Sequence, residues 1–77
     1  MTAIILVETA IGKARAVLGV LRKITGVVEV SAYTWPYDII ATVRAEDSGK
    51  LEALVNKSIR SVEGITRITP CLKVNLE

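Results

Sequence analysis

The 77-residue chain has no histidine, no phenylalanine and only one cysteine, Cys71. A single thiol cannot form a disulfide within the chain. Because histidine is absent and Cys, Asp and Glu form no close cluster at ligand spacing, we expect no metal site, and we expect no cofactor. A domain of this size buries only about 60% of its unfolded surface and commonly needs disulfides, a metal or partner subunits. Self-association is the remaining way to stabilise so small a domain, so we expect a homo-oligomer.

Long apolar runs and dense charge stripes are also missing. The longest apolar run, AIILV at residues 3–7, is far shorter than the roughly 20 residues that span a bilayer or the apolar core of a signal peptide. Ten basic residues nearly balance eight acidic ones, and the basic residues are scattered along the chain. That distribution argues against direct nucleic-acid binding. With its lone thiol, the chain is typical of a cytoplasmic protein that makes no membrane contact.

Two segments of the chain resemble each other, RKITGVVEV at 22–30 and RSVEGITRI at 60–68. Each pattern predicts the end of a helix, a left-handed glycine cap and then a strand. Apolar residues at helical spacing precede both glycines and predict one helix over about residues 12–25 and a second that begins at Asp47 or Ser48. The apolar positions are Ala14, Val17, Leu18, Leu21 and Ile24 in the first helix, and Leu51, Leu54, Val55, Ile59 and Val62 in the second.

The remaining apolar stretches predict four strands, at residues 2–8, 27–34, 37–45 and 65–77. The order is β-α-β-β-α-β, an α+β ferredoxin-like fold with a four-stranded antiparallel sheet and two helices on one face. In this fold the first and third strands are central. Pro70 suits an edge strand, because an edge tolerates a missing N–H. We expect residues 1–77 to form a single domain with no DNA-binding domain.

The predicted central strands are apolar on both faces. Ile5 and Val7 alternate with Ile4 and Leu6, and Ile40 lies on the third strand. With both helices on one face, the other face would be exposed, and such an apolar patch marks an interaction surface. We expect a second copy to cover it, sheet against sheet, at about 800 Å² per subunit. The expected dimer-interface residues are Ile4, Leu6, Tyr33 and Ile40.

All of the aromatic residues fall within positions 33–37, in the sequence YTWPY. Pro36 stiffens this turn, and leaving Trp35 in solvent would forgo several kcal/mol at about 25 cal/mol per Å². The carboxylate of Asp38 could accept from an ammonium group while nearby N–H groups address a carboxylate, which together suit an α-amino acid. Equally, Asp38 could bond only turn amides and the aromatics could pack only at an interface. The residues alone leave both readings open.

Three segments together resemble the RAM domain, the effector-binding and oligomerising module of the Lrp/AsnC (leucine-responsive regulator) family. They are IGKARAVLGVLRKITGVVEV, TWPYDIIATVRAED and IRSVEGITRITP, and the likeness covers essentially the whole chain. The resemblance implies dimers through the sheet faces, rings of dimers, and amino-acid effectors bound between dimers near the hairpin. It implies ligand-binding roles for Thr34, Tyr37 and Asp38, and more loosely for Thr69. A full-length regulator of this family is an implied partner that would supply DNA contact.

Position 35 departs from the family, which commonly has glycine where this chain has Trp35. Tryptophan before proline does not easily adopt a positive φ, so we expect the pocket to be reshaped, plugged by the indole or devoted to assembly. Trp35 is therefore counted among the ligand-binding candidates.

Two other readings compete with an amino-acid-binding module. One is a purely structural homo-oligomer without a ligand. The other is a small enzyme, because two-subunit ferredoxin-like barrels host oxygenase and isomerase chemistry. We assign no catalytic residue, since histidine is absent, Cys71 has no evident base and Asp38 has no second carboxylate near it in sequence.

Overall fold

The computed structural model describes residues 1–74 and 76 and has the predicted β-α-β-β-α-β order. The second helix continues as a short stretch of π-helix, η1. The elements are β1 Thr2–Thr9, α1 Ala14–Leu21, β2 Val27–Ala32, β3 Ile39–Arg44, α2 Ser48–Ala53, η1 Leu54–Ile59 and β4 Ile65–Leu72.

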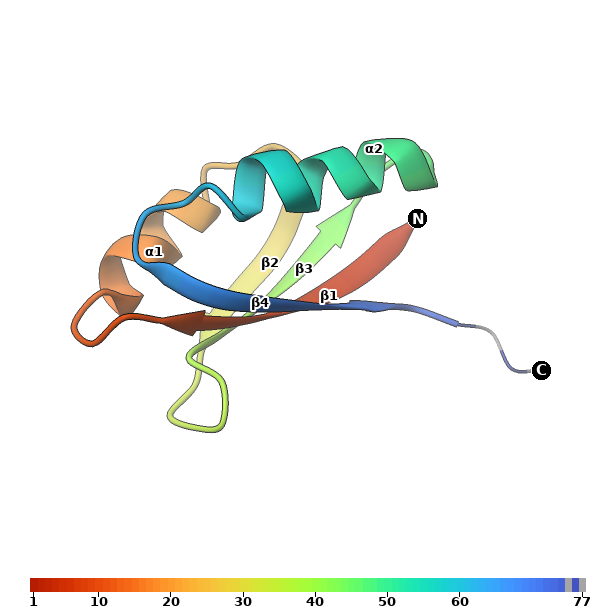
Figure 1. Ribbon diagram of the computed structural model, residues 1–77. Helices are drawn as coiled ribbons and strands as arrows, with labels where there is room; N and C mark the ends of the chain where they lie inside the picture. The colour runs from red at the N-terminus through yellow and green to blue at the C-terminus, as the bar shows by residue number, and fades with distance from the viewer. Residues whose placement is uncertain (75, 77) are drawn as a thin grey trace.

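The four strands form one antiparallel sheet in the order β2-β3-β1-β4. The prediction of a ferredoxin-like fold is therefore confirmed, with the first and third strands at the centre. Figure 1 shows both helices on one side of the sheet. Pro70 pairs with Ile5 on the edge strand β4, where its missing N–H costs no ladder bond.

Several predicted bounds were too wide. Helix α1 is shorter than residues 12–25, because Gly12 turns at φ +80° before the helix begins and residues 22–26 form a turn after it. The second and third strands stop at the hairpin, leaving residues 33–38 outside the ladder. The predicted last strand ended at residue 77, but β4 ends at Leu72. Its partner β1 begins at Thr2, which accepts from the Lys73 N–H at 3.4 Å. Residues 75 and 77 of that prediction lie outside the described residues.

A single apolar core lies between the helices and the covered face of the sheet. The predicted alternation is confirmed, since every second residue of β1 and β3 is buried. The core residues are Ala3, Ile5 and Val7 of β1, Ile39, Ala41 and Val43 of β3, Val17 and Leu21 of α1, Leu51, Val55 and Ile59 of the second helix, and Ile68 of β4.

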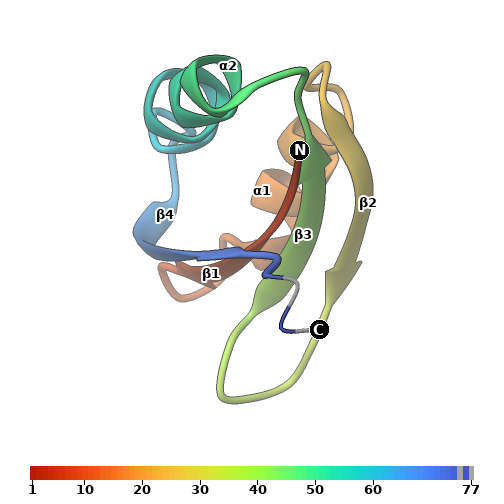
Figure 2. The same ribbon diagram turned by 90° about the vertical axis from the view of Figure 1, so that its right-hand side faces the viewer.

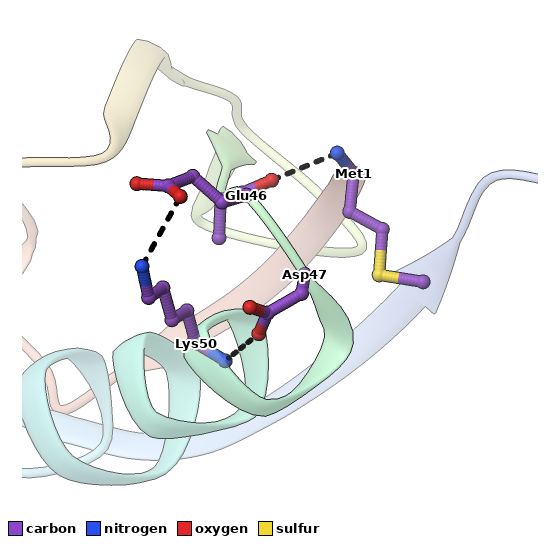
Figure 3. Close-up of polar contacts among 5 residues, drawn as sticks. Met1, Glu46, Asp47 and Lys50 are labelled. Atoms are coloured by element: carbon purple, nitrogen blue, oxygen red, sulfur yellow. Dashed lines mark hydrogen bonds and ion pairs between the residues drawn. The ribbon is translucent and has the colours of Figure 1, made fainter.

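The start of α2 is held by polar contacts that Figure 3 shows in detail. Asp47 caps the helix as predicted, with its Oδ1 accepting from the Lys50 N–H at 2.8 Å. The Lys50 Nζ also lies 3.2 Å from the Glu46 carboxylate in an exposed ion pair. The amino group of Met1 donates to the Ala45 carbonyl oxygen at 2.8 Å, which places the start of β1 beside the loop before α2.

Substitution of Gly26 tests the role of the predicted glycine caps. Gly26 and Gly64 have φ values of +102° and +99°, and a Cβ on Gly26 would lie 2.7 Å from Leu54 Cδ2 and 3.3 Å from the Arg44 carbonyl oxygen. We expect Gly26→Ala to lower the free energy of unfolding by about 2 kcal/mol through backbone strain and overpacking. Urea denaturation at one fixed protein concentration measures the change.

Gly19→Ala is the matched control for that substitution. Gly19 lies within α1, and its added Cβ would have no atom within 4 Å. The same change should therefore stabilise the protein by about 0.5–1 kcal/mol, because alanine restricts the unfolded chain and favours the helix. Equal effects of the two substitutions would contradict the conformational role of Gly26.

Candidate functional site

The helices leave one face of the sheet uncovered, which we call the open face. Ile4 and Leu6 of β1 and Ile40 of β3 lie on it, as predicted from the alternation of the strands. Ile4 is 44% exposed, and the other two side chains are half-buried. Leu6 pairs with Ile40 on one side and with Thr69 on the other. These residues form an apolar centre that neither helix of the described chain covers.

Charged side chains lie at both ends of the open face. Near the hairpin, Glu8 of β1 pairs in register with Arg67 of β4, and its carboxylate lies 4.0 Å from the Arg67 Nε. At the other end, Thr2 pairs with Arg44 and its carbonyl oxygen accepts from the Lys73 N–H. The apolar centre is thus bordered by polar residues, an arrangement typical of protein interfaces.

The loop from β2 to β3, residues 33–38, forms a hairpin that extends away from the helices (Figures 1 and 2). The Tyr33 N–H donates to the Asp38 carbonyl oxygen at 2.8 Å and closes the loop. Inside it, the peptide bond from Trp35 to Pro36 is cis. Trp35 is 83% exposed and Tyr33 is 52% exposed. The hairpin therefore presents two large aromatic side chains to solvent.

Asp38 attaches the hairpin to the central strand β1. Its N–H donates to the Val7 carbonyl oxygen at 3.1 Å, and its Oδ2 accepts from the Thr9 N–H at 2.8 Å in a partly buried position. The pairing of β1 with β4 shifts register between Glu8 and Thr9, so this carboxylate satisfies an amide at an irregularity of the sheet. The sequence suggested bonds to turn amides, whereas the observed partner lies on another strand.

The structure brings four of the five predicted ligand-binding residues together on one short segment and leaves one apart. The four are Thr34, Trp35, Tyr37 and Asp38, and they belong to the hairpin together with Tyr33, a predicted dimer-interface residue. The fifth residue, Thr69, lies on β4 beside Leu6. It is about 12 Å from the Asp38 backbone by the spacing of strands. Thr69 therefore lies apart from the hairpin within one subunit.

A groove that the sequence did not indicate lies between the second helix and the ends of β1 and β4. Its volume is about 220 Å³, and its walls are mainly apolar. The lining includes Ala3, Leu51, Val55 and Leu72, with Glu52 and Asn56 among its polar residues. These residues come from three segments that are distant in sequence, so no local sequence pattern could predict the groove.

Cys71 is exposed on β4, where it pairs with Ile4 across the open face. Its Sγ lies 3.8 Å from the Thr69 carbonyl oxygen. Within residues 1–74 and 76, no three His, Cys, Asp or Glu side chains lie where they could hold a metal ion together. In the same described part of the chain, no helix combines the length and apolar character needed to cross a membrane.

Comparison with known proteins identifies one family. The model of the Lrp/AsnC ligand binding domain matches residues 2–72. No curated protein matches the chain. Among solved structures, TTHA0845 from Thermus thermophilus shares 30% identity at a TM-score of 0.90, covering 99% of this chain and 95% of that one. The hypothetical protein PHS023 from Pyrococcus horikoshii shares 28% identity at a TM-score of 0.88, covering 96% and 89%.

A longer regulator shares the fold at lower identity. The transcriptional regulator NMB0573 from Neisseria meningitidis, solved as a complex with L-Met, has 19% identity and a TM-score of 0.84. The match covers 97% of this chain and 50% of the regulator, so the chain spans about half of that protein's length. At this identity the likeness concerns the fold alone.

Proposed function

Since the chain belongs to the Lrp/AsnC ligand-binding domain family, we propose that it binds an α-amino acid and sets the oligomeric state of a transcription regulator. The family is that of a regulator's effector-binding domain, which is a regulatory role rather than a catalytic one. The observation that carries the finer proposal is the exposed aromatic hairpin anchored by Asp38, because it joins a ligand-sized set of polar groups to an apolar surface.

The proposed ligand lies at the hairpin, next to Asp38. One carboxylate oxygen accepts from the Thr9 N–H, and among the described residues none donates to its Oδ1, which is free to accept from a ligand's ammonium group. Backbone N–H groups of the exposed turn can address the ligand's carboxylate. Thr34 and Tyr37 would add hydroxyl contacts, and Thr69 would come from a neighbouring subunit. L-Met in the Neisseria regulator belongs to the same ligand class.

The proposed dimer forms through the open face. Ile4, Leu6 and Ile40 supply its apolar centre, and Tyr33, which follows β2 at the start of the hairpin, would extend the interface. The face has an apolar centre bordered by polar residues at both ends, so two copies can cover each other's apolar centres. This arrangement supports pairing of like faces about a two-fold axis.

Rings of such dimers, with hairpins between them, are the proposed higher assembly. We place DNA contact outside these 77 residues, in a full-length regulator of the same family that joins a mixed assembly in the cytoplasm. The effector would then act by favouring one assembly over another, since a ligand shifts an equilibrium only through different affinities for its states.

The amino-acid proposal is tested by titration, because Trp35 is the only tryptophan and lies in the proposed site. Each of the twenty amino acids is added while Trp35 emission and light scattering are recorded. We expect one or a few of them to give a saturable emission change together with a change in mass. If the protein is a multimer whose Trp35 emission and mass change with none of the amino acids, amino-acid sensing is contradicted.

A second candidate is a structural homo-oligomer without a ligand. The hydrogen bond from the Thr9 N–H to Asp38 favours it, because the carboxylate already has a structural partner at 2.8 Å. In that case the hairpin would serve only to join subunits. The same titration separates the two candidates, since only the sensor responds to an added amino acid.

A further inference from the structure

Trp35 is the largest exposed apolar side chain on the described surface. It is 83% exposed at the turn of the hairpin, although a buried tryptophan removes roughly 150–250 Å² of surface from water. An indole N–H is a hydrogen-bond donor with no acceptor role. A surface that receives this side chain should therefore be an apolar hollow with an acceptor at its mouth.

The groove beside the second helix has these properties. Its walls include Leu51, Val55 and Leu72, and its polar lining includes Glu52 and Asn56. The Glu52 carboxylate and the Asn56 side-chain oxygen are both acceptors. The volume of about 220 Å³ lies below the roughly 300 Å³ at which pockets for drug-sized ligands begin, so it suits one large side chain.

The groove is less suited to a free amino acid. None of the described side chains that line it is a lysine or an arginine, and the Met1 ammonium group in its lining already donates to the Ala45 carbonyl oxygen at 2.8 Å. The first turn of α2 is already capped by the Asp47 carboxylate, which repels a second anion. An indole needs only an acceptor, and Glu52 and Asn56 provide acceptors in the groove.

Trp35 cannot reach the groove of its own subunit. Ala3 lines the groove, whereas the hairpin begins where Val7 pairs with Ile39, about 13 Å farther along β1 by the rise of a strand. Figures 1 and 2 show the hairpin extending away from α2 and its start. Any tryptophan of this kind in the groove must come from another subunit.

We propose that the groove between the second helix and β1/β4 receives Trp35 from a neighbouring subunit outside the open-face dimer. The contact joins two different surfaces, the hairpin and the groove, which lie at opposite ends of the domain. Contacts of this kind, repeated from one dimer to the next, form a closed ring when the successive rotations add up to a full turn. This inference rests on the proposed function, because it names the surface that meets the hairpin in the proposed ring. The open face remains available for the dimer.

Two substitutions test the contact from its two sides. Trp35→Ala removes the indole, and Asn56→Tyr fills the groove from an exposed helix position. Lys57→Tyr is the control, since Lys57 is exposed on the same helix and does not line the groove. Sedimentation velocity over a concentration series gives the mass, and Trp35 emission reports whether the indole leaves water.

We expect both Trp35→Ala and Asn56→Tyr to raise the dissociation constant between dimers by about 30-fold or more, as loss of a central anchor does. Both should remain dimers, and Lys57→Tyr should assemble like the unaltered protein. In Asn56→Tyr, Trp35 emission should stay at the wavelength of a hydrated indole. An equimolar mixture of the two variants should recover larger assemblies, because one contributes open grooves and the other contributes Trp35.

Distinct outcomes overturn this inference and the proposed function. If Asn56→Tyr assembles normally with a shielded Trp35, the hairpin docks elsewhere and the inference is wrong. If an amino acid binds the unaltered protein, leaving Trp35 hydrated, and Asn56→Tyr abolishes that binding, the groove is an effector site and the inference is again wrong. An unaltered protein that stops at the dimer refutes the groove contact and the proposed ring, and leaves the open-face dimer and amino-acid binding standing. A monomer refutes the oligomeric function itself.

Discussion

Replacing Ile4 and Ile40 together by lysine should separate the proposed dimer into folded monomers. Ile4 is 44% exposed and Ile40 is half-buried on the open face, so each lysine can reach water in a single subunit. Packed against a partner, each ammonium group would be buried without a counter-ion, at a cost of about 3–5 kcal/mol. The dimer dissociation constant should therefore rise on the order of a thousandfold or more. Analytical ultracentrifugation measures the change.

Val20→Lys is the control for that double substitution. Val20 lies on α1 and is 47% exposed, which nearly matches Ile4, but it faces away from the sheet. This variant should pair like the unaltered protein. Cys71 provides a second measurement, because it pairs with Ile4 on the open face. Its reaction with a thiol reagent should be slower in the dimer than in the lysine variant. Normal pairing of the double variant would show that the open face is not the interface.

Replacing Asp38 by asparagine should separate ligand binding from folding. Asparagine keeps an acceptor oxygen for the Thr9 N–H, so the free energy of unfolding should stay within about 1 kcal/mol of its original value. The charge that pairs with an ammonium group is lost, and a charge-assisted hydrogen bond is worth roughly 1.5–3 kcal/mol. The affinity for the amino acid found by titration should therefore fall roughly 10- to 150-fold. Trp35 emission gives the affinity, and urea denaturation gives the stability.

Asp38→Ala completes the comparison. Alanine leaves the partly buried Thr9 N–H without its acceptor, so we expect a further loss of about 1–3 kcal/mol in the free energy of unfolding. Affinity that is unchanged in the asparagine variant would show that the carboxylate does not hold the ligand. In that case the structural oligomer becomes the better interpretation of the hairpin.

The order of elements could be predicted because its signals are local. Gly26 and Gly64 have the positive φ values that their positions after helices implied, and Asp47 caps α2. The alternation of Ile4 with Ile5 placed one residue on each face of the sheet. Such features depend on residues that are neighbours in sequence, where glycine conformation, capping and periodicity act directly.

The ends of the strands depended on partners elsewhere in the chain. An apolar pattern after Pro70 predicted a strand to residue 77, but β4 stops at Leu72 because β1 starts at Thr2 and offers no ladder bond beyond Lys73. The candidate site divides in the same way. The hairpin residues are consecutive and could be grouped by inspection, whereas the distance of Thr69 from Asp38 follows from the order of the strands.

The amino-acid sequence by itself determined the βαββαβ order, the apolar character of both sheet faces and the gathering of aromatics at one turn. Only the tertiary structure decided that the Asp38 carboxylate bonds the Thr9 N–H, that Thr69 lies beside Leu6, and that a groove opens next to Asn56. The physical reason is the range of the interactions. Periodicity and caps act within a few residues, while pairing register and hollows arise only when distant segments pack together.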